Sequence, residues 1–262
     1  MNPARQKRAL AVAVQAARAA GQLMQRNASA RKKINEEAPH DIKLELDVRC
    51  QKLIEARLLA TFPASSVWGE EGLAGDPDAD VRWVVDPIDG TVNFTYGIPH
   101  ACVSIACQHR PAGADDFETC AGVVYDPFAD ELWSAVRGGP ARLNGRIIRV
   151  SDRRTLGETI VSIGFGKDAT VVNAMLPVFG RLIHRVRKVR IMGAAALALT
   201  YVASGRFDAY IEPRLRFWDI AAGGLILECA GGEFWRRPVP GEETFEVIAT
   251  NGRLRRQIQR HV

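Results

Sequence analysis

The sequence predicts a layered α/β or α+β fold, and three features of the chain support this prediction. The first sixty residues carry apolar side chains at helical spacing. After Pro63, short β-rich runs alternate with Gly and Pro, as in a sheet built from several strands. From Thr170 onward, helical and strand-like segments alternate. Because each helix and each sheet must bury an apolar face against another element, a layered architecture follows.

Two helices are expected in the first sixty residues. The first spans about Pro3 to Asn27, and the second spans Asp41 to Ala60, where apolar side chains recur at steps of three and four. The segment Ala30 to His40 between them is polar and charged. We therefore expect a mobile loop there.

The remaining elements follow from local composition. Strands are expected at Ser66–Trp68, Arg82–Val85, Cys102–Gln108, Thr119–Tyr125, Glu131–Ala135, Thr159–Phe165, Phe207–Ile211 and Phe245–Thr250. Helices are expected at Val171–His184, Ala194–Ser204, Trp218–Ala230 and Leu254–His261. The 262 residues can form one large domain or two packed halves. We expect an N-terminal half (1–145) and a C-terminal half (146–262) in one compact unit.

Neither long apolar run of the chain favours a membrane segment. Ala9–Val14 follows basic residues, as in a secretory signal, but Gln15 and Arg18 interrupt it, so an amphipathic helix is the better interpretation. Ile191–Ala203 has only 13 uncharged residues, whereas a membrane-spanning helix needs about 20. The five scattered cysteines lack a CxxC pair and favour a reducing compartment over disulfides or a zinc site. We therefore expect a cytoplasmic protein that does not bind membranes.

The net charge of +5 raises the question of a nucleic-acid partner. Residues 180–262 contain 14 Lys and Arg against 8 Asp and Glu, and the densest basic run is Arg181–Arg190. Basic clusters of this kind can contact phosphate backbones. In this run, however, Leu, Ile and Val alternate with the charges, which suits a half-buried helix followed by a strand. Nucleic-acid binding is therefore kept as an alternative and not as the main function.

Acidic residues in short motifs indicate the chemistry. They lie in Trp68-Gly69-Glu70-Glu71-Gly72, in Trp83-Val84-Val85-Asp86-Pro87-Ile88-Asp89-Gly90-Thr91 and in Trp218-Asp219-Ile220-Ala221-Ala222. A further acid, Asp47, lies inside the second predicted helix.

Asp86 and Asp89 stand at the carboxyl end of an apolar strand, where ligands of open α/β sheets gather. Pro87 stiffens the turn between them, and Gly90-Thr91 can begin a helix whose free amides favour phosphate. Hard oxygen ligands without His or Cys select Mg²⁺, which commonly joins carboxylates to a substrate phosphate. The residues therefore predict metal-assisted phosphoryl transfer to water.

Each motif also has a simpler explanation. A Glu-Glu pair after a strand is usually a solvated turn, and Asp-Pro-x-Asp-Gly often forms a hairpin turn. Asp219 before an apolar run can be a helix N-cap, and Asp47 can lie on a polar helix face. Taken singly, none of these motifs establishes a metal site.

Taken together and in this order, the motifs GEEG, DPIDGTVNF and WDIAAGGLILECAGG resemble those of the inositol monophosphatase family. The resemblance extends from Asp41–Asp47 to Ala249-Thr250-Asn251 and covers most of the chain. It implies a sugar-phosphatase-like αβαβα sandwich and a lithium-sensitive phosphomonoesterase that uses two or three Mg²⁺ ions. It also implies a homodimer.

The resemblance further implies roles for individual positions. Glu70, Asp86 and the carbonyl of Ile88 match ligands of one metal, and Asp86, Asp89 and Asp219 match those of a second. Thr91 with Asp47, assisted by Glu70, matches the group that orients and deprotonates the attacking water. The amides of Gly90 and Thr91 match a phosphate cradle, and Ala195 and Glu212 match contacts to the alcohol part of the substrate. The implied reaction is direct in-line attack by water, without a phosphoenzyme.

Four positions depart from the family pattern. Glu36 stands where the family often has a basic residue. Lys43 replaces an apolar residue and Leu44 replaces a Thr before Asp47, while Arg216 stands where inositol-selective members have His. Because guanidinium binds phosphate bidentately, Arg216 could hold a second anionic group of the substrate, or it could be a solvated surface residue.

The expected function is therefore hydrolysis of a small sugar or inositol monophosphate, with inositol 1-phosphate as the first candidate. Fructose bisphosphate, phosphoadenosine phosphate and histidinol phosphate are alternatives, because proteins with this signature cleave them too. A different class of function is a protein that binds nucleic acid or the transcription machinery through its basic C-terminal part.

Overall fold

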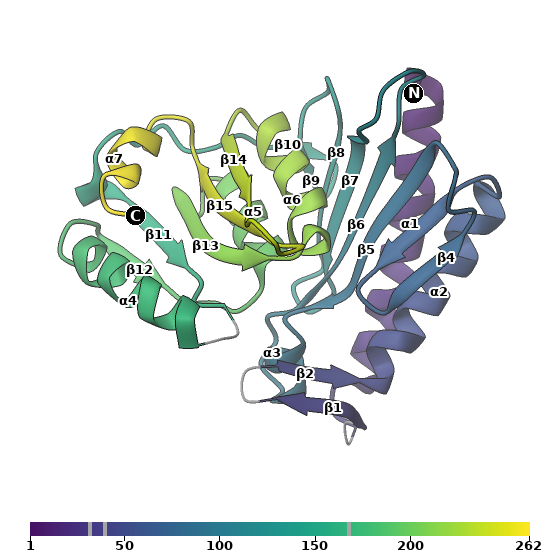
Figure 1. Ribbon diagram of the computed structural model, residues 1–262, viewed down its shortest axis with the longest axis horizontal. Helices are drawn as coiled ribbons and strands as arrows, with labels where there is room; N and C mark the ends of the chain where they lie inside the picture. Colours follow the sequence, from purple (N-terminus) through teal and green to yellow (C-terminus); the bar gives the residue numbers. More distant parts are fainter. Residues whose placement is uncertain (31–32, 39–40, 167–168) are drawn as a thin grey trace.

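The computed structural model describes residues 1–30, 33–38, 41–166 and 169–262. Two large sheets alternate with three layers of helices, as Figure 1 shows. One outer layer contains α1 (Pro3–Asn27) and α2 (Glu45–Thr61). The central layer contains α5 (Ala195–Ala203) and α6 (Phe217–Cys229). The opposite outer layer contains α4 (Ala169–Ile183) and α7 (Arg255–Gln259). The predicted layered αβαβα architecture is confirmed.

The first sheet has eight strands in the order β10-β9-β8-β7-β6-β5-β3-β4. Only β3 and β5 pair in parallel; the other neighbours are antiparallel. Its strands are β3 (Ser66–Gly69), β4 (Gly72–Gly75), β5 (Val81–Asp89), β6 (Cys102–His109), β7 (Glu118–Asp126), β8 (Glu131–Val136), β9 (Arg142–Leu143) and β10 (Arg146–Ile147). Helices cover both faces of its central strands, which explains why every residue of β5 except Arg82 is buried.

The second sheet has five strands in the order β12-β11-β13-β15-β14. Strand β11 pairs in parallel with β12 and β13, and β15 pairs antiparallel with β13 and β14. Its strands are β11 (Ile160–Ile163), β12 (Lys188–Arg190), β13 (Ala209–Leu215), β14 (Glu233–Pro238) and β15 (Phe245–Thr250). A short 3-10 helix, η1 (Leu156–Glu158), precedes β11.

Helix α1 begins where the sequence predicts. Asn2 is the N-cap, its side-chain oxygen accepts from the Arg5 amide at 2.8 Å, and Pro3 occupies the first helical position. The buried face of α1 is rich in Ala, so the helix packs closely against the sheet. A Cβ at Gly21 would lie 2.5 Å from the ring of Tyr125, which shows why that position is a glycine.

Helix α6 lies between the two sheets and is buried on nearly all sides. Close packing on both faces requires small residues. A Cβ at Gly223 would lie 2.8 Å from Leu199, and a Cβ at Gly224 would lie 2.4 Å from Phe234 of β14. The all-round apolar sequence of α6 is thus what a central layer demands.

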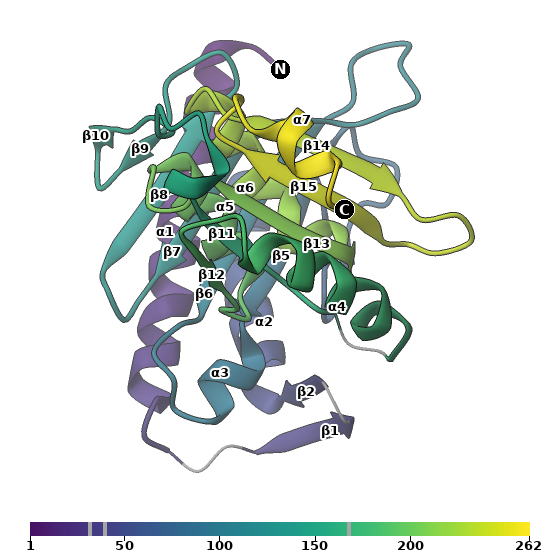
Figure 2. The ribbon, with the colours of Figure 1, turned by 90° about the vertical axis from the view of Figure 1, so that its left-hand side faces the viewer.

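The chain between the first two helices differs from the prediction. Residues 41–44 form strand β2 (Asp41–Leu44), so the second helix begins four residues later than predicted. The predicted mobile loop at Ala30–His40 contains strand β1 (Ile34–Ala38), which pairs antiparallel with β2; residues 31–32 and 39–40 lie outside the described residues. Figure 2 shows this hairpin beside the short helix α3 (Thr91–Thr95).

Further differences are small. The last helix, α7, is shorter than the predicted Leu254–His261, and strands β4, β9, β10 and β14 were not predicted. Within the described part of the chain, no helix combines the length and the apolar character needed to cross a membrane.

Candidate active site

Strand β5 carries Asp86 and Asp89 into the space beside the central helices. The register of β5 against β6 shifts between these two residues, and Pro87 lies in the shift. Proline has no amide to donate, so it is tolerated where the strand ladder is interrupted. The Ile88 amide donates to Asp86 Oδ1 at 3.0 Å and fixes the turn. Both carboxyl side chains are buried, as a solvated hairpin turn would not be.

Gly90 turns the chain from β5 into α3. Its φ of 88° is left-handed, and a Cβ there would lie 2.9 Å from the carbonyl oxygen of His100. Thr91 follows as the first residue of α3, and its hydroxyl lies 2.8 Å from the Ile88 carbonyl oxygen. The predicted start of a helix at Gly90-Thr91 is confirmed.

Asp47 comes from a different layer and lies next to Thr91. The Thr91 hydroxyl is 3.3 Å from Asp47 Oδ1, and the Leu44 amide donates to Asp47 Oδ2 at 2.9 Å. Asp47 is only 2% exposed, so it does not lie on a solvated helix face. Leu44 departs from the family pattern, and its side chain is buried in the core. Its amide is capped by the Asp47 carboxylate.

Two further acids are held by backbone amides at helix starts. The Ala195 and Ala196 amides, at the beginning of α5, donate to Asp89 Oδ1 and Oδ2 at 3.1 and 2.8 Å. The Arg216 amide donates to Asp219 Oδ2 at 2.8 Å at the beginning of α6. Amides at a helix N-terminus stabilise a carboxylate, which partly offsets the cost of burial.

The acids influence one another electrostatically. Burial and the neighbouring carboxylate of Glu70 raise the pKa of Asp47 to about 8. Burial, Glu70, Asp89, Asp219 and Asp47 together hold the pKa of Asp86 well above its ordinary value. We call Asp47, Glu70, Asp86, Asp89 and Asp219 the acidic cluster.

The pKa of Asp89 is also raised, but by burial, and hydrogen bonds partly offset the rise. Burial raises its pKa to about 6, while the amides of Ala196 and Ala195 limit the rise. Carboxylates that resist ionisation because of one another are the groups a divalent cation would stabilise.

Glu70 follows β3, and its turn is positioned by a residue that the motifs did not indicate. The Glu70 amide donates to the Val85 carbonyl at 3.1 Å. Gln51 of α2 is buried; its Oε1 accepts from the Glu71 amide at 2.9 Å, and its Nε2 donates to the Gly72 carbonyl at 3.2 Å. A Cβ at Gly69 would overlap the Gln51 side chain, so this glycine makes room for that contact.

Asn93 is a second residue without a predicted role. Its Nδ2 donates to the carbonyls of His100 and Met192 at 2.9 and 2.8 Å, which ties α3 to the segment before α5. The only signal for it in the sequence is its place in the DPIDGTVNF motif.

The donor chemistry of the acidic cluster fits Mg²⁺. All of its side chains offer hard oxygen atoms, and the Ile88 carbonyl lies among them. Within the described residues, no three acidic, His or Cys side chains form a ready-made metal cage. The described hydrogen bonds of these carboxylates come from protein donors. Metal binding would therefore require the carboxylate side chains to change their positions.

The predicted substrate contacts lie in three different settings. The Ala195 amide is engaged with Asp89. Glu212, in β13, accepts from the Tyr210 hydroxyl and from the Gly166 amide. Arg216 is exposed; its guanidinium lies 3.7 Å from the Glu243 carboxylate and over the ring of Trp218. Arg216 therefore has a protein partner where a substrate anion was considered.

The five-layer fold, with an acidic cluster at the start of α3, is typical of a class of proteins. Comparison with known proteins identifies the family. The model of the inositol monophosphatase family matches residues 5–255. The chain therefore belongs to the inositol monophosphatase family.

Named relatives carry two kinds of description. The chain is 40% identical over 231 residues to Nus factor SuhB of Pseudomonas aeruginosa, covering 85% of this chain and 83% of that protein. It is 37% identical over 233 residues to inositol monophosphatase 2 of Solanum lycopersicum, covering 84% of each. The crystal structure of extragenic suppressor protein suhB from Bartonella henselae superposes with a TM-score of 0.87 at 33% identity, covering 95% of this chain and 96% of that one.

Proposed function

We propose that this protein is a Mg²⁺-dependent phosphomonoesterase. The observation that carries the proposal is the acidic cluster: carboxylates from α2, β5, α6 and the turn after β3 raise the pKa of the buried Asp47 and Asp86. An isolated structural site would gain nothing from such repulsion, whereas a dication would relieve it and then attract a phosphate.

Different residues are proposed to bind each metal ion. Glu70, Asp86 and the Ile88 carbonyl are proposed ligands of one ion, and Asp86, Asp89 and Asp219 are proposed ligands of a second. When bound, Mg²⁺ supplies charge neutralisation at the phosphate and lowers the pKa of water. Two or three ions are proposed for each site.

Thr91 and Asp47 are proposed to handle the attacking water. The Thr91 hydroxyl can accept a hydrogen bond from water while it donates its own proton to Asp47 or to the Ile88 carbonyl, at 3.3 and 2.8 Å. Without metal, burial and Glu70 raise the pKa of Asp47 to about 8, so this carboxyl is mostly protonated at neutral pH. A bound cation would favour its ionised form, which is proposed to accept a proton from the water through Thr91, with Glu70 assisting. The amides of Gly90 and Thr91 are proposed to hold the phosphate oxygens.

We propose inositol 1-phosphate as the first substrate to test. Glu212 and the backbone at Ala195 are proposed to contact the alcohol part, and Arg216 is proposed to contribute only if it leaves Glu243. Fructose bisphosphate, phosphoadenosine phosphate and histidinol phosphate remain competing substrates.

A phosphate-release panel tests this proposal. Each substrate is offered with Mg²⁺, and kcat/KM values are compared. We expect release that depends on Mg²⁺, is suppressed by lithium and is highest for inositol 1-phosphate. Metal-independent release, or no release from any of the four compounds, would contradict the proposed function.

A second candidate function is suggested by the relatives that are named Nus factor SuhB. We propose that a role with the transcription machinery, if present, uses the basic C-terminal part, since residues 180–262 carry the positive surplus. Binding of single-stranded RNA at increasing salt tests this role, because contacts to the phosphate backbone weaken steeply as salt rises. Absence of RNA binding at low salt would remove a direct nucleic-acid role.

We further infer a cytoplasmic homodimer in which the halves 1–145 and 146–262 unfold together. Light scattering tests the dimer, and a single cooperative unfolding transition tests the joint unit. A monomeric mass or two separate transitions would contradict these inferences.

A further inference from the structure

A surface pocket lies where strands β11 and β13 of the five-stranded sheet begin. Its volume is about 740 Å³, within the range of small-molecule sites. We call it the arginine pocket and define it by the lining residues Asp152, Arg153, Arg154, Thr155, Glu158 and Arg187. Ile160, the first residue of β11, lies at its base.

The pocket and the proposed active site occupy opposite ends of the same two strands. Asp208, immediately before β13, lies at the pocket, whereas Glu212, four residues later, lies beside Gly164 at the far end of β11. Four residues of strand span roughly 13 Å. The arginine pocket is therefore a separate place and not an extension of the acidic cluster.

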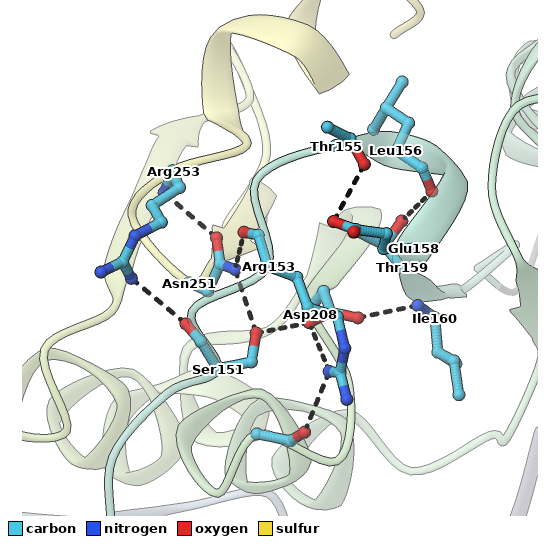
Figure 3. A network of polar contacts seen from close by, with 11 residues as sticks. Ser151, Arg153, Thr155, Leu156, Glu158, Thr159, Ile160, Asp208, Asn251 and Arg253 are labelled. Carbon is cyan, nitrogen blue, oxygen red and sulfur yellow. Dashed lines mark hydrogen bonds and ion pairs between the residues drawn. The ribbon is translucent and has the colours of Figure 1, made fainter.

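A hydrogen-bond network around Asp208 joins Arg153 and Ile160, two of the residues that line the pocket. Asp208 is fully buried; it accepts from the Ser151 hydroxyl, from the Arg153 guanidinium at 2.8 Å and from the Ile160 amide at 2.8 Å. Asn251 donates to the Ser151 hydroxyl at 3.0 Å and to the Arg153 carbonyl at 2.9 Å. Figure 3 shows Ser151, Arg153 and Asn251 gathered around Asp208.

Arg153 is thereby fixed in position at the edge of the pocket. Its NH1 group serves Asp208 and the Gly205 carbonyl, and the side chain keeps 40% of its exposure. The ion pair with a buried carboxylate orients the guanidinium without covering it, so its outer donors can serve a ligand.

Two more arginines line the pocket from different segments. The Arg154 carbonyl accepts from Gln257 Nε2 at 2.8 Å, and the Arg187 amide donates to the Thr159 carbonyl at 2.9 Å, so both backbones are anchored. Across the described ranges, neither side chain forms an ion pair, and both are exposed. Guanidinium groups that line one pocket suit a phosphate, which they bind through paired hydrogen bonds.

The two acids of the pocket narrow the class of ligand. Asp152 and Glu158 would repel a ligand that is anionic throughout, such as an extended polyphosphate. Carboxylates do accept hydrogen bonds from hydroxyl groups. Glu158 already accepts one from the Thr155 hydroxyl at 2.9 Å. A ligand with one phosphate and several hydroxyls satisfies both kinds of lining residue.

We propose that the arginine pocket binds a small sugar phosphate. Arg153, Arg154 and Arg187 hold the phosphate, and Asp152 and Glu158 accept hydrogen bonds from the sugar hydroxyls. Binding here requires no Mg²⁺ and no residue of the acidic cluster, and so does not depend on the proposed phosphatase activity.

Calorimetric titration of the full chain with ribose 5-phosphate, without divalent metal, tests the proposal. We expect one molecule bound per chain. The double variant Arg154→Ala/Arg187→Ala should bind at least tenfold more weakly. The matched control Arg185→Ala/Arg260→Ala removes two exposed charges that do not line the pocket and should bind within twofold of wild type.

Four results would overturn the proposal. They are no binding to wild type at millimolar concentration, equal weakening in both double variants, binding that appears only when Mg²⁺ is added, and inorganic phosphate binding as tightly as the sugar phosphate. A short single-stranded RNA that binds more tightly than ribose 5-phosphate and loses affinity only in Arg154→Ala/Arg187→Ala would assign the pocket to a nucleic-acid backbone instead. Both variants alter exposed side chains, and unchanged melting temperatures will confirm that they fold.

Discussion

The acidic cluster and the arginine pocket are both proposed to bind phosphate, but through side chains of opposite charge. Three acids of the cluster, Asp47, Asp86 and Asp89, are buried, and neighbouring carboxylates raise the pKa of Asp47 and Asp86, so the cluster is expected to attract phosphate through a cation. The arginine pocket is open, and its guanidinium groups can meet an anion directly. The comparison teaches that the sign of the lining charge decides whether a phosphate is bound through a cation or directly.

Replacement of an acid should separate the two regions most strongly. We expect Asp219→Asn and Asp89→Asn to lower kcat for phosphate release on the order of a thousandfold, because each removes a charge that would hold Mg²⁺. Asp152→Asn, which removes an acid from the arginine pocket, is the matched control and should keep activity near wild type. Full activity in either cluster variant would remove that residue from the proposed ligands.

Thr91→Val should have the next largest effect. It preserves the shape of the side chain but removes the hydroxyl that lies between Asp47 and the Ile88 carbonyl. We expect kcat to fall about a hundredfold, the lower range for a lost proton-transfer group, with little change in KM. Thr155→Val in the arginine pocket is the control. A Thr91→Val enzyme with raised KM and unchanged kcat would assign Thr91 to substrate binding only.

The acidic cluster should make stability depend on pH and Mg²⁺. Because the folded-state pKa values of Asp47 and Asp89 are raised, the folded state binds more protons than the unfolded state between pH 3.8 and about 8. The free energy of unfolding without metal should therefore fall as pH rises through this range.

Melting temperatures at pH 6 and pH 8, with EDTA or with Mg²⁺, measure this effect. Mg²⁺ should raise the melting temperature by several degrees more at pH 8 than at pH 6, because more of the carboxylates are ionised at pH 8. This difference corresponds to a free energy of unfolding on the order of 1–2 kcal/mol. A Mg²⁺ effect that is equal at both pH values, or larger at pH 6, would contradict metal binding by these acids.

Arg216→Ala should have the smallest effect. Its guanidinium is exposed and lies near Glu243, and exposed ion pairs contribute little. We expect KM for inositol 1-phosphate and for fructose bisphosphate to change less than about threefold. A much larger loss confined to fructose bisphosphate would show that Arg216 holds the second phosphate after all.

The acidic cluster could be predicted from the sequence because most of its residues lie in short local motifs. Asp86, Pro87, Asp89 and Gly90 determine a strand end, a turn and a helix start within a few residues, and the structure places them so. The contact between Thr91 and Asp47 joins elements 44 residues apart, and it was expected only from the family resemblance.

The hairpin of β1 and β2 could not be predicted in the same way. Residues 41–44 continue a helical pattern into α2, so the sequence alone favours one longer helix. The structure pairs them with residues 34–38, and such pairing outweighs local preference. Gln51 escaped notice for a related reason, because its role depends on a turn 20 residues away.

The arginine pocket was invisible to sequence analysis. The network that orients Arg153 also contains Ser151, Asp208 and Asn251. These residues are separated by up to 100 positions and share no motif. Counting charges found the basic surplus of the C-terminal part but not its arrangement. The ion pair of Arg153 with Asp208 orients one arginine, while Arg154 and Arg187 retain their charge for a ligand.

The most direct test of the account is phosphate release from inositol 1-phosphate by four proteins: wild type, Asp219→Asn, Arg154→Ala/Arg187→Ala and Arg185→Ala/Arg260→Ala. We predict that wild type and both arginine double variants release phosphate at similar rates with Mg²⁺ and not with EDTA, and that Asp219→Asn releases almost none. Release that persists in EDTA or in Asp219→Asn would contradict the assignment of catalysis to the acidic cluster.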